Sequence, residues 1–154
     1  MNSRRALSLL ASTVVGLAMV PSSGIAQEKT LKQQIQGPWS GVSCTTTGPN
    51  NYCANNSRGA MILAGNGNYA LAVFAGGRKD ANSPGAAASF GTWSVNETDK
   101  TLTLHRVGAL DPTQDGKDLK VNISLNGEEL KYTGDVKTAD GKDVHLDGTW
   151  RRFK

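Results

Sequence analysis

Residues 90–106 read Phe-Gly-Thr-Trp-Ser-Val-Asn-Glu-Thr-Asp-Lys-Thr-Leu-Thr-Leu-His-Arg. Trp93 and Val95 share one face of a first strand, because successive side chains of a strand point to opposite faces. Leu102 and Leu104 share one face of a second strand, and the polar residues between the strands satisfy turn backbone groups locally. The stretch predicts a half-buried antiparallel hairpin. A lone hairpin is marginally stable in water, so this hairpin needs neighbouring strands.

The rest of the chain supplies such strands. Apolar and polar residues alternate in further short segments at 39–47, 58–63, 68–74, 119–125, 129–136 and 144–151. Asn66-Gly67 and Asn126-Gly127 are hairpin-turn signals, whereas Gly76–Ala88 reads as a long connection. An open meander of this kind would expose two edges, which closure removes. The sequence therefore predicts an all-β fold, an eight-stranded up-and-down antiparallel barrel whose interior is either filled by side chains or holds one small ligand.

The N-terminus has the pattern of a secretory signal peptide. Arg4 and Arg5 precede an uncharged apolar run, and Gly24-Ile25-Ala26 is a small-x-small cleavage site. The apolar run is short for a membrane span. We therefore expect a signal peptide over residues 1–26, a periplasmic or secreted protein, and no membrane span after cleavage.

Two further units follow the signal peptide. Residues 27–36 form an N-terminal segment in which Leu31 and Ile35 lie on one helical face and Thr30 caps a short helix. Gly37-Pro38 ends that helix, so the barrel domain is expected over residues 37–154.

Charge and cysteine content narrow the function. The full chain carries a formal charge of +4, and removing Arg4 and Arg5 leaves +2, which does not favour a nucleic-acid partner. Cys44 and Cys53 are the two cysteines of the sequence. In an exported chain an even number at short separation favours a disulfide over a metal pair or a reactive thiol.

Catalytic and cofactor motifs do not emerge. The sequence contains no H-E-x-x-H, G-x-S-x-G or C-x-x-C motif. Gly65–Ala70 matches a dinucleotide pattern, but a strand follows it where that motif requires a helix. We expect no metal and no cofactor. His105 and His145 fall on polar strand faces by alternation.

Alternation also selects candidate ligand-binding residues. Inward positions combine apolar walls with a few polar groups, which is how small-molecule pockets are built. These candidates are Tyr69, Leu71, Val73, Trp93, Leu104, Ile123, Tyr132 and Leu146, with Arg106 near one mouth as a site for a carboxylate. The small residues Ala86–Ser89 leave room inside the barrel. Three Gly-x-Trp triplets end at Trp39, Trp93 and Trp150, and are expected to pack in the core, with Gly leaving space beside the indole.

Several of these segments resemble the bacterial lipocalin-like domain. The resemblance covers most of residues 36–152. It rests on Gly37-Pro38-Trp39, the apolar strand with its Gly-Asn-Gly turn over Gly59–Tyr69, Gly91–Val95 before Leu102–His105, Gly108–Pro112 with a following Gly and strand, and Leu125–Leu130 leading to Trp150-Arg151-Arg152. The resemblance implies a lipocalin-like (calycin) barrel that binds a small apolar or amphipathic ligand. Members carry a His after the Leu-Thr strand, matched by His105, and an Arg at the start of the next. Leu119-Lys120 stands at that place, so a ligand role for that Arg does not transfer.

A second resemblance is to small periplasmic inhibitors of bacterial metalloproteases, which are eight-stranded barrels with one disulfide. Gly37-Pro38-Trp39, Cys44, Cys53 and Phe90–Val95 fit that family. It implies inhibition of a secreted protease through an N-terminal tail, here Gln27–Gln34. The whole segment Gln27–Gln36 is expected to lie outside the barrel. We thus expect a non-catalytic ligand binder first, a protease inhibitor second and a small barrel enzyme third.

Overall fold

The computed structural model describes residues 28–47, 53–54, 56–80, 85–137 and 141–154. The expected signal peptide and Gln27 lie outside these residues, as do parts of the loops near 50, 82 and 139. Among the described residues there is no helix with the length and apolar character that crossing a membrane requires.

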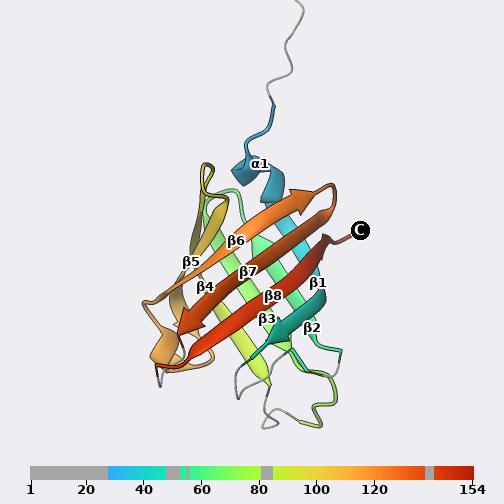
Figure 1. Ribbon diagram of the computed structural model, residues 1–154, viewed down its shortest axis with the longest axis vertical. Helices are drawn as coiled ribbons and strands as arrows, with labels where there is room; N and C mark the ends of the chain where they lie inside the picture. The colour runs from blue at the N-terminus through green and yellow to red at the C-terminus, as the bar shows by residue number, and fades with distance from the viewer. Residues whose placement is uncertain (1–27, 48–52, 55, 81–84, 138–140) are drawn as a thin grey trace, which may run out of the picture.

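The described strands form a closed antiparallel barrel in which each strand pairs with its sequence neighbours and the first pairs with the last (Figure 1). They are β1 (Gly37–Thr46), β2 (Arg58–Leu63), β3 (Asn68–Phe74), β4 (Ala86–Asn96), β5 (Thr101–Ala109), β6 (Asp118–Asn126), β7 (Glu129–Lys137) and β8 (Asp143–Arg152). A short helix α1 (Leu31–Ile35) precedes the barrel, and a 3₁₀ turn η1 (Pro112–Gln114) joins β5 to β6. The predicted eight-stranded up-and-down barrel with a short N-terminal helix is confirmed.

The hairpin formed by β4 and β5 follows the alternation of the sequence. Trp93 pairs with Leu104 and Val95 pairs with Leu102, so the four apolar side chains share the inward face. In the turn, the side-chain oxygen of Asn96 accepts hydrogen bonds from the backbone N–H groups of Thr98 and Asp99, at 2.9 and 3.1 Å. The turn therefore satisfies its own backbone, as its residue types predict.

Strand β4 begins earlier than expected. Ala86 pairs with Phe74 and Ala88 pairs with Ala72, so the alanines assigned to the connection over Gly76–Ala88 belong to the sheet. Alanine has weak strand preference, but pairing along β3 overrides it here.

Helix α1 covers one end of the barrel, beside the β4–β5 turn, and η1 lies at the other end (Figure 1). At the N-terminal end of α1, the Glu97 carboxylate accepts hydrogen bonds from the backbone N–H groups of Leu31 and Lys32, both at 2.9 Å. Carboxylates at this position also interact favourably with the helix dipole. The β4–β5 turn thus holds the start of α1 on the barrel.

The end of α1 is held from β8. The Arg152 guanidinium lies 4.0 Å from the ring centre of Trp39 and donates to the carbonyl oxygens of Gln34 and Gln36. Ile35 is fully buried in the core. The expectation that the whole N-terminal segment lies outside the barrel is therefore wrong, because Ile35 packs where that end of the barrel would otherwise meet water.

The tryptophans of the three Gly-x-Trp triplets, Trp39, Trp93 and Trp150, are all buried. The space beside Trp150 comes from another glycine: a Cβ added to Gly59 would lie 2.9 Å from the Trp150 ring. A Cβ on Gly148 would instead meet Tyr132 Oη at 2.5 Å. Gly148, the glycine of the last triplet, therefore makes room for the Tyr132 side chain of the neighbouring strand.

Alternation is incomplete on the outer surface. Ile62, Phe74, Phe90 and Val107 are 44–59% exposed on β2 to β5. The outward residues of β6 to β8 are mainly charged or polar, as expected. Only part of the barrel therefore presents the polar outer stripe that the sequence predicts.

Candidate functional site

A cavity of about 440 Å³ lies inside the barrel. Its wall is mostly apolar. The lining includes Thr46 and Lys137 at strand ends and Asp111 and Gln114 around η1. The cavity therefore extends to the end of the barrel opposite α1.

The inward positions chosen from the sequence converge on this cavity. Seven of the nine candidates line it, namely Leu71, Val73, Leu104, Arg106, Ile123, Tyr132 and Leu146. They come from five strands, β3 and β5 to β8. Their role in binding a ligand stays a prediction.

Tyr69 and Trp93 point inward without lining the cavity. Trp93 is buried near α1, and its indole N–H donates to the carbonyl oxygen of Ala64 at 2.9 Å. Tyr69 donates through its hydroxyl to Ser89 Oγ at 3.1 Å. Both rings fill the barrel between the cavity and its covered end.

Other residues line the cavity although the sequence reading did not select them. Eight are apolar residues on the inward face of their strands, and strict alternation could have found them; they are Met61, Leu102, Leu119, Val121, Leu130, Val136, Val144 and Trp150. Asp111 and Gln114 lie at a short 3₁₀ turn, where no periodicity predicts the direction of a side chain. The sequence therefore predicts the strand residues of the cavity wall better than the residues at the open end of the cavity.

Small side chains on β4 keep the interior open. Ala86–Ser89 all contribute to the cavity lining, with Ala87 opposite Val73 and Ser89 opposite Leu71. Further along the same strand, the indole of Trp93 points inward and is buried. On β4, small side chains therefore line the cavity and bulky ones lie in the filled half of the barrel.

Three of the polar residues that line the cavity, Arg106, Asp111 and Gln114, lie together at η1. Arg106 Nη1 donates to Gln114 Oε1 at 3.2 Å. Asp111 accepts from the backbone N–H of Thr113 at 3.0 Å and from its hydroxyl at 2.7 Å. These bonds, with the hydroxyl contributing most, lower the pKa of Asp111, so this carboxylate is ionised at neutral pH.

Both histidines lie on the outer face, as alternation predicts. His105 contacts Asp118 at 2.8 Å, and His145 contacts Asp135 at 2.7 Å. In the part of the chain that the structure describes, no cluster of three or more His, Cys, Asp or Glu side chains is placed to hold a metal ion.

A second depression lies on the outside, between α1 and β6. Its lining mixes charged residues such as Glu28, Lys29 and Glu97 with aliphatic residues such as Leu31 and Leu125. The interior cavity is instead lined mainly by aliphatic and aromatic side chains, which makes it the better candidate for an apolar ligand.

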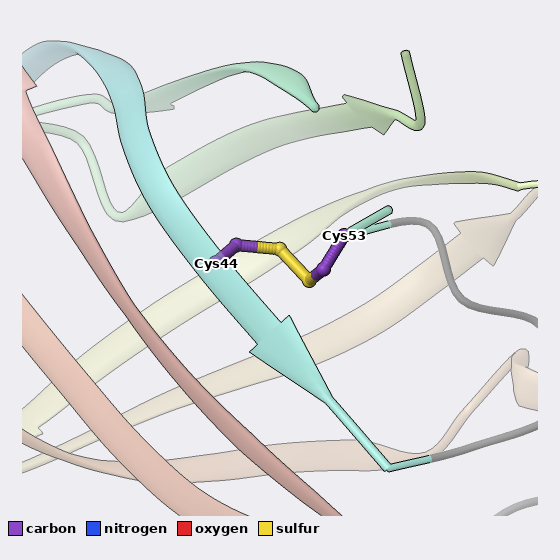
Figure 2. Close-up of a disulfide and its surroundings, with 2 residues drawn as sticks. All are labelled: Cys44 and Cys53. Carbon is purple, nitrogen blue, oxygen red and sulfur yellow. A yellow bond between two sulfur atoms is a disulfide. The ribbon is translucent and has the colours of Figure 1, made fainter. Parts of the chain in front are cut away.

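Cys44 on β1 and Cys53 form a disulfide, as the sequence predicts (Figure 2). Their Cα atoms lie 5.1 Å apart. The bridge ties the end of β1 to the segment that leads into β2. It lies toward the same end of the barrel as the cavity residue Thr46.

No family model matches this chain, and no curated protein matches it. Among solved structures, the chain is similar to bovine odorant binding protein, in a complex with a selenium-containing odorant, with a TM-score of 0.50 and 13% sequence identity. The similarity covers 83% of this chain and 76% of that one. At this identity the likeness concerns the fold, and the closed eight-stranded barrel of this chain is a lipocalin-like fold.

Proposed function

We propose that this protein is an exported, non-catalytic barrel that binds one small apolar or amphipathic molecule in its interior. The cavity of about 440 Å³ carries this proposal, because its volume falls in the range of about 300–1,000 Å³ that is usual for ligand pockets. Its mostly aliphatic wall, with few polar groups, is the second support. An apolar molecule that leaves water for such a wall gains roughly 25 cal/mol for each Å² that it buries.

Two observations support export. The N-terminal residues have the pattern of a signal peptide, and the Cys44–Cys53 disulfide suits an oxidising compartment. The bovine protein with a lipocalin-like barrel was solved with an odorant, a small molecule, which is compatible with small-molecule binding here.

The test uses the neutral fluorophore phenylnaphthylamine, whose emission rises in apolar surroundings. We expect saturable binding at one site in the wild-type protein. Ala87→Leu adds volume to the cavity wall and should weaken binding by about tenfold or more, since overfilling an interior costs roughly 1–3 kcal/mol.

The matched control is Ala70→Leu, the same substitution at an exposed position of β3. It should leave the affinity for the fluorophore unchanged. Absence of saturable binding to the wild-type protein, or equal affinities of the two variants, would contradict an interior site.

A further inference from the structure

The inference concerns Arg106, a cation in the wall of a mostly apolar cavity. Arg106 lies on the inward face of β5, pairs with Gly91 on β4, and is half-buried. Partial removal of a guanidinium from water is unfavourable unless hydrogen bonds or an opposite charge compensate it. The hydrogen-bond and ion-pair partners of the Arg106 side chain therefore show whether its charge is compensated within the protein.

Among the described residues, Arg106 has no carboxylate within ion-pair distance. Its side-chain hydrogen bond goes to Gln114, whose amide is neutral. By contrast, Arg151 on the outer surface contacts Glu129 at 2.6 Å, and Lys137, which lines the cavity at the end of β7, contacts Asp143 at 2.7 Å. Arg106 lacks the counter-charge that these two cations have.

Asp111, the acidic residue in the cavity lining, does not serve as the counter-charge of Arg106. Asp111 lines the cavity, but its carboxylate accepts two hydrogen bonds from Thr113. Lys117 and Arg106 act on the pKa of Asp111 only as minor electrostatic causes. Most of the hydrogen-bonding capacity of the guanidinium, which has five N–H donors, is thus left for a ligand.

A second donor lies on the adjacent strand. Ser89 lines the cavity on the inward face of β4, and its oxygen accepts the hydroxyl of Tyr69 at 3.1 Å. Because this oxygen is already an acceptor, the proton of Ser89 is available to another acceptor. Ser89 and Gly91 share the inward face of β4, so Ser89 lies one inward position from the residue that pairs with Arg106.

We propose that the ligand is an amphipathic monocarboxylate: Arg106 binds its carboxylate, with Ser89 as a second donor, and its hydrocarbon part packs against Leu104 and Ile123. This rests on the proposed interior binding site and adds the chemistry of the head group. Guanidinium and carboxylate match in a planar, two-bond geometry, which a hydroxyl or an ester cannot reproduce.

The experiment compares three ligands with the same hydrocarbon chain in displacement of phenylnaphthylamine at neutral pH: decanoate, decanol and methyl decanoate. In the wild-type protein decanoate should bind about tenfold or more tightly than either neutral ligand, because hydrogen bonds to charged groups are about twice as strong as neutral ones. This comparison needs no variant, so it holds even where a substitution disturbs folding.

Variants locate the preference. Arg106→Gln should remove the advantage of decanoate over decanol and keep decanol binding, and Arg106→Lys should keep part of the advantage. Arg151→Gln removes a surface cation and should change neither affinity. Circular dichroism of each variant checks the fold.

Two outcomes would overturn the inference and leave the interior site standing: equal wild-type affinities for decanoate and decanol, or a decanoate preference that survives in Arg106→Gln. Failure of all three ligands and of the fluorophore to bind would instead contradict the proposed function itself. A preference for decanoate that Arg106→Gln abolishes supports the inference.

Discussion

Tyr69 lies in the filled part of the barrel and forms a hydrogen bond with Ser89, which lines the cavity. Its ring is buried, with 4% of the residue exposed, and its hydroxyl reaches Ser89 in the cavity wall. Burial raises the pKa of Tyr69, while the hydrogen bond with Ser89 and the charge of Arg106 lower it by less. Tyr69 therefore remains a neutral donor at physiological pH, and the Ser89 oxygen accepts its hydrogen bond while the Ser89 hydroxyl can still donate to a ligand.

The raised pKa makes the stability of the protein depend on pH in the alkaline range. The unfolded chain loses the tyrosine proton near pH 10.0, whereas the folded protein keeps it to a higher pH. The contribution of Tyr69 to stability is therefore complete below about pH 10 and is lost as pH rises through the folded-state pKa. We expect the free energy of unfolding to fall more steeply above pH 10 in the wild-type protein than in Tyr69→Phe.

Urea unfolding followed by tryptophan fluorescence at a series of pH values measures this difference. Other groups that titrate in this range are common to both proteins, so the difference between the two curves isolates Tyr69. Parallel curves above pH 10 would show that burial does not disfavour the tyrosinate form in the folded protein.

Strand β4 shows how one element divides the barrel. From Ala86 to Ser89 it presents small side chains and lines the cavity, and from Gly91 to Asn96 it carries Trp93 and Val95 into the packed half. On this strand the bulky inward residues begin at Trp93, and the small residues before it leave space for the cavity. Eight strands permit either a filled or a hollow interior, so side-chain size on strands such as β4 decides between them.

The disulfide links β1 to the chain that enters β2, and its contribution is set by the loop that it closes. Cys44 and Cys53 are separated by 9 residues in sequence. Closing a loop of this length removes about 2.5 kcal/mol of entropy from the unfolded chain on the loop-closure model. We expect the double variant Cys44→Ser/Cys53→Ser to lose about that much free energy of unfolding in urea and to keep the barrel's circular dichroism spectrum.

Reduction of the wild-type protein should lower its stability to that of the double variant, which itself does not respond to the reductant. Alkylation of the unreduced, denatured protein followed by intact-mass measurement gives an independent check. Modification of both thiols under those conditions would mean that the protein does not carry the bridge.

Across the molecule, the barrel was predictable because each segment carries local information about strand and turn. Alternation in Leu119–Leu125 assigns every side chain to a face, and Asn126-Gly127 marks the turn that follows. The same parity placed Arg106 inside and His105 outside. The disulfide was predictable because the sequence has two cysteines and was expected to be exported.

Features that depend on three-dimensional packing were less predictable. Gln114 enters the cavity lining from a 3₁₀ turn, where no period assigns a direction. The burial of Ile35 depends on Glu97 and Arg152, which come from distant parts of the sequence. Tyr69 and Trp93 have the right parity for the cavity but lie too near the covered end to reach it, because parity assigns a face and gives no depth along the barrel axis.

Intermolecular nuclear Overhauser effects between bound phenylnaphthylamine and protein labelled at Ile, Leu and Val methyl groups test the interior site most directly. An occupied interior predicts contacts from the ligand's aromatic protons to the methyl groups of Leu104, Val121 and Leu146, which line the cavity. Contacts confined to Ile62 and Val107, which are exposed on the outer face, would contradict the interior site.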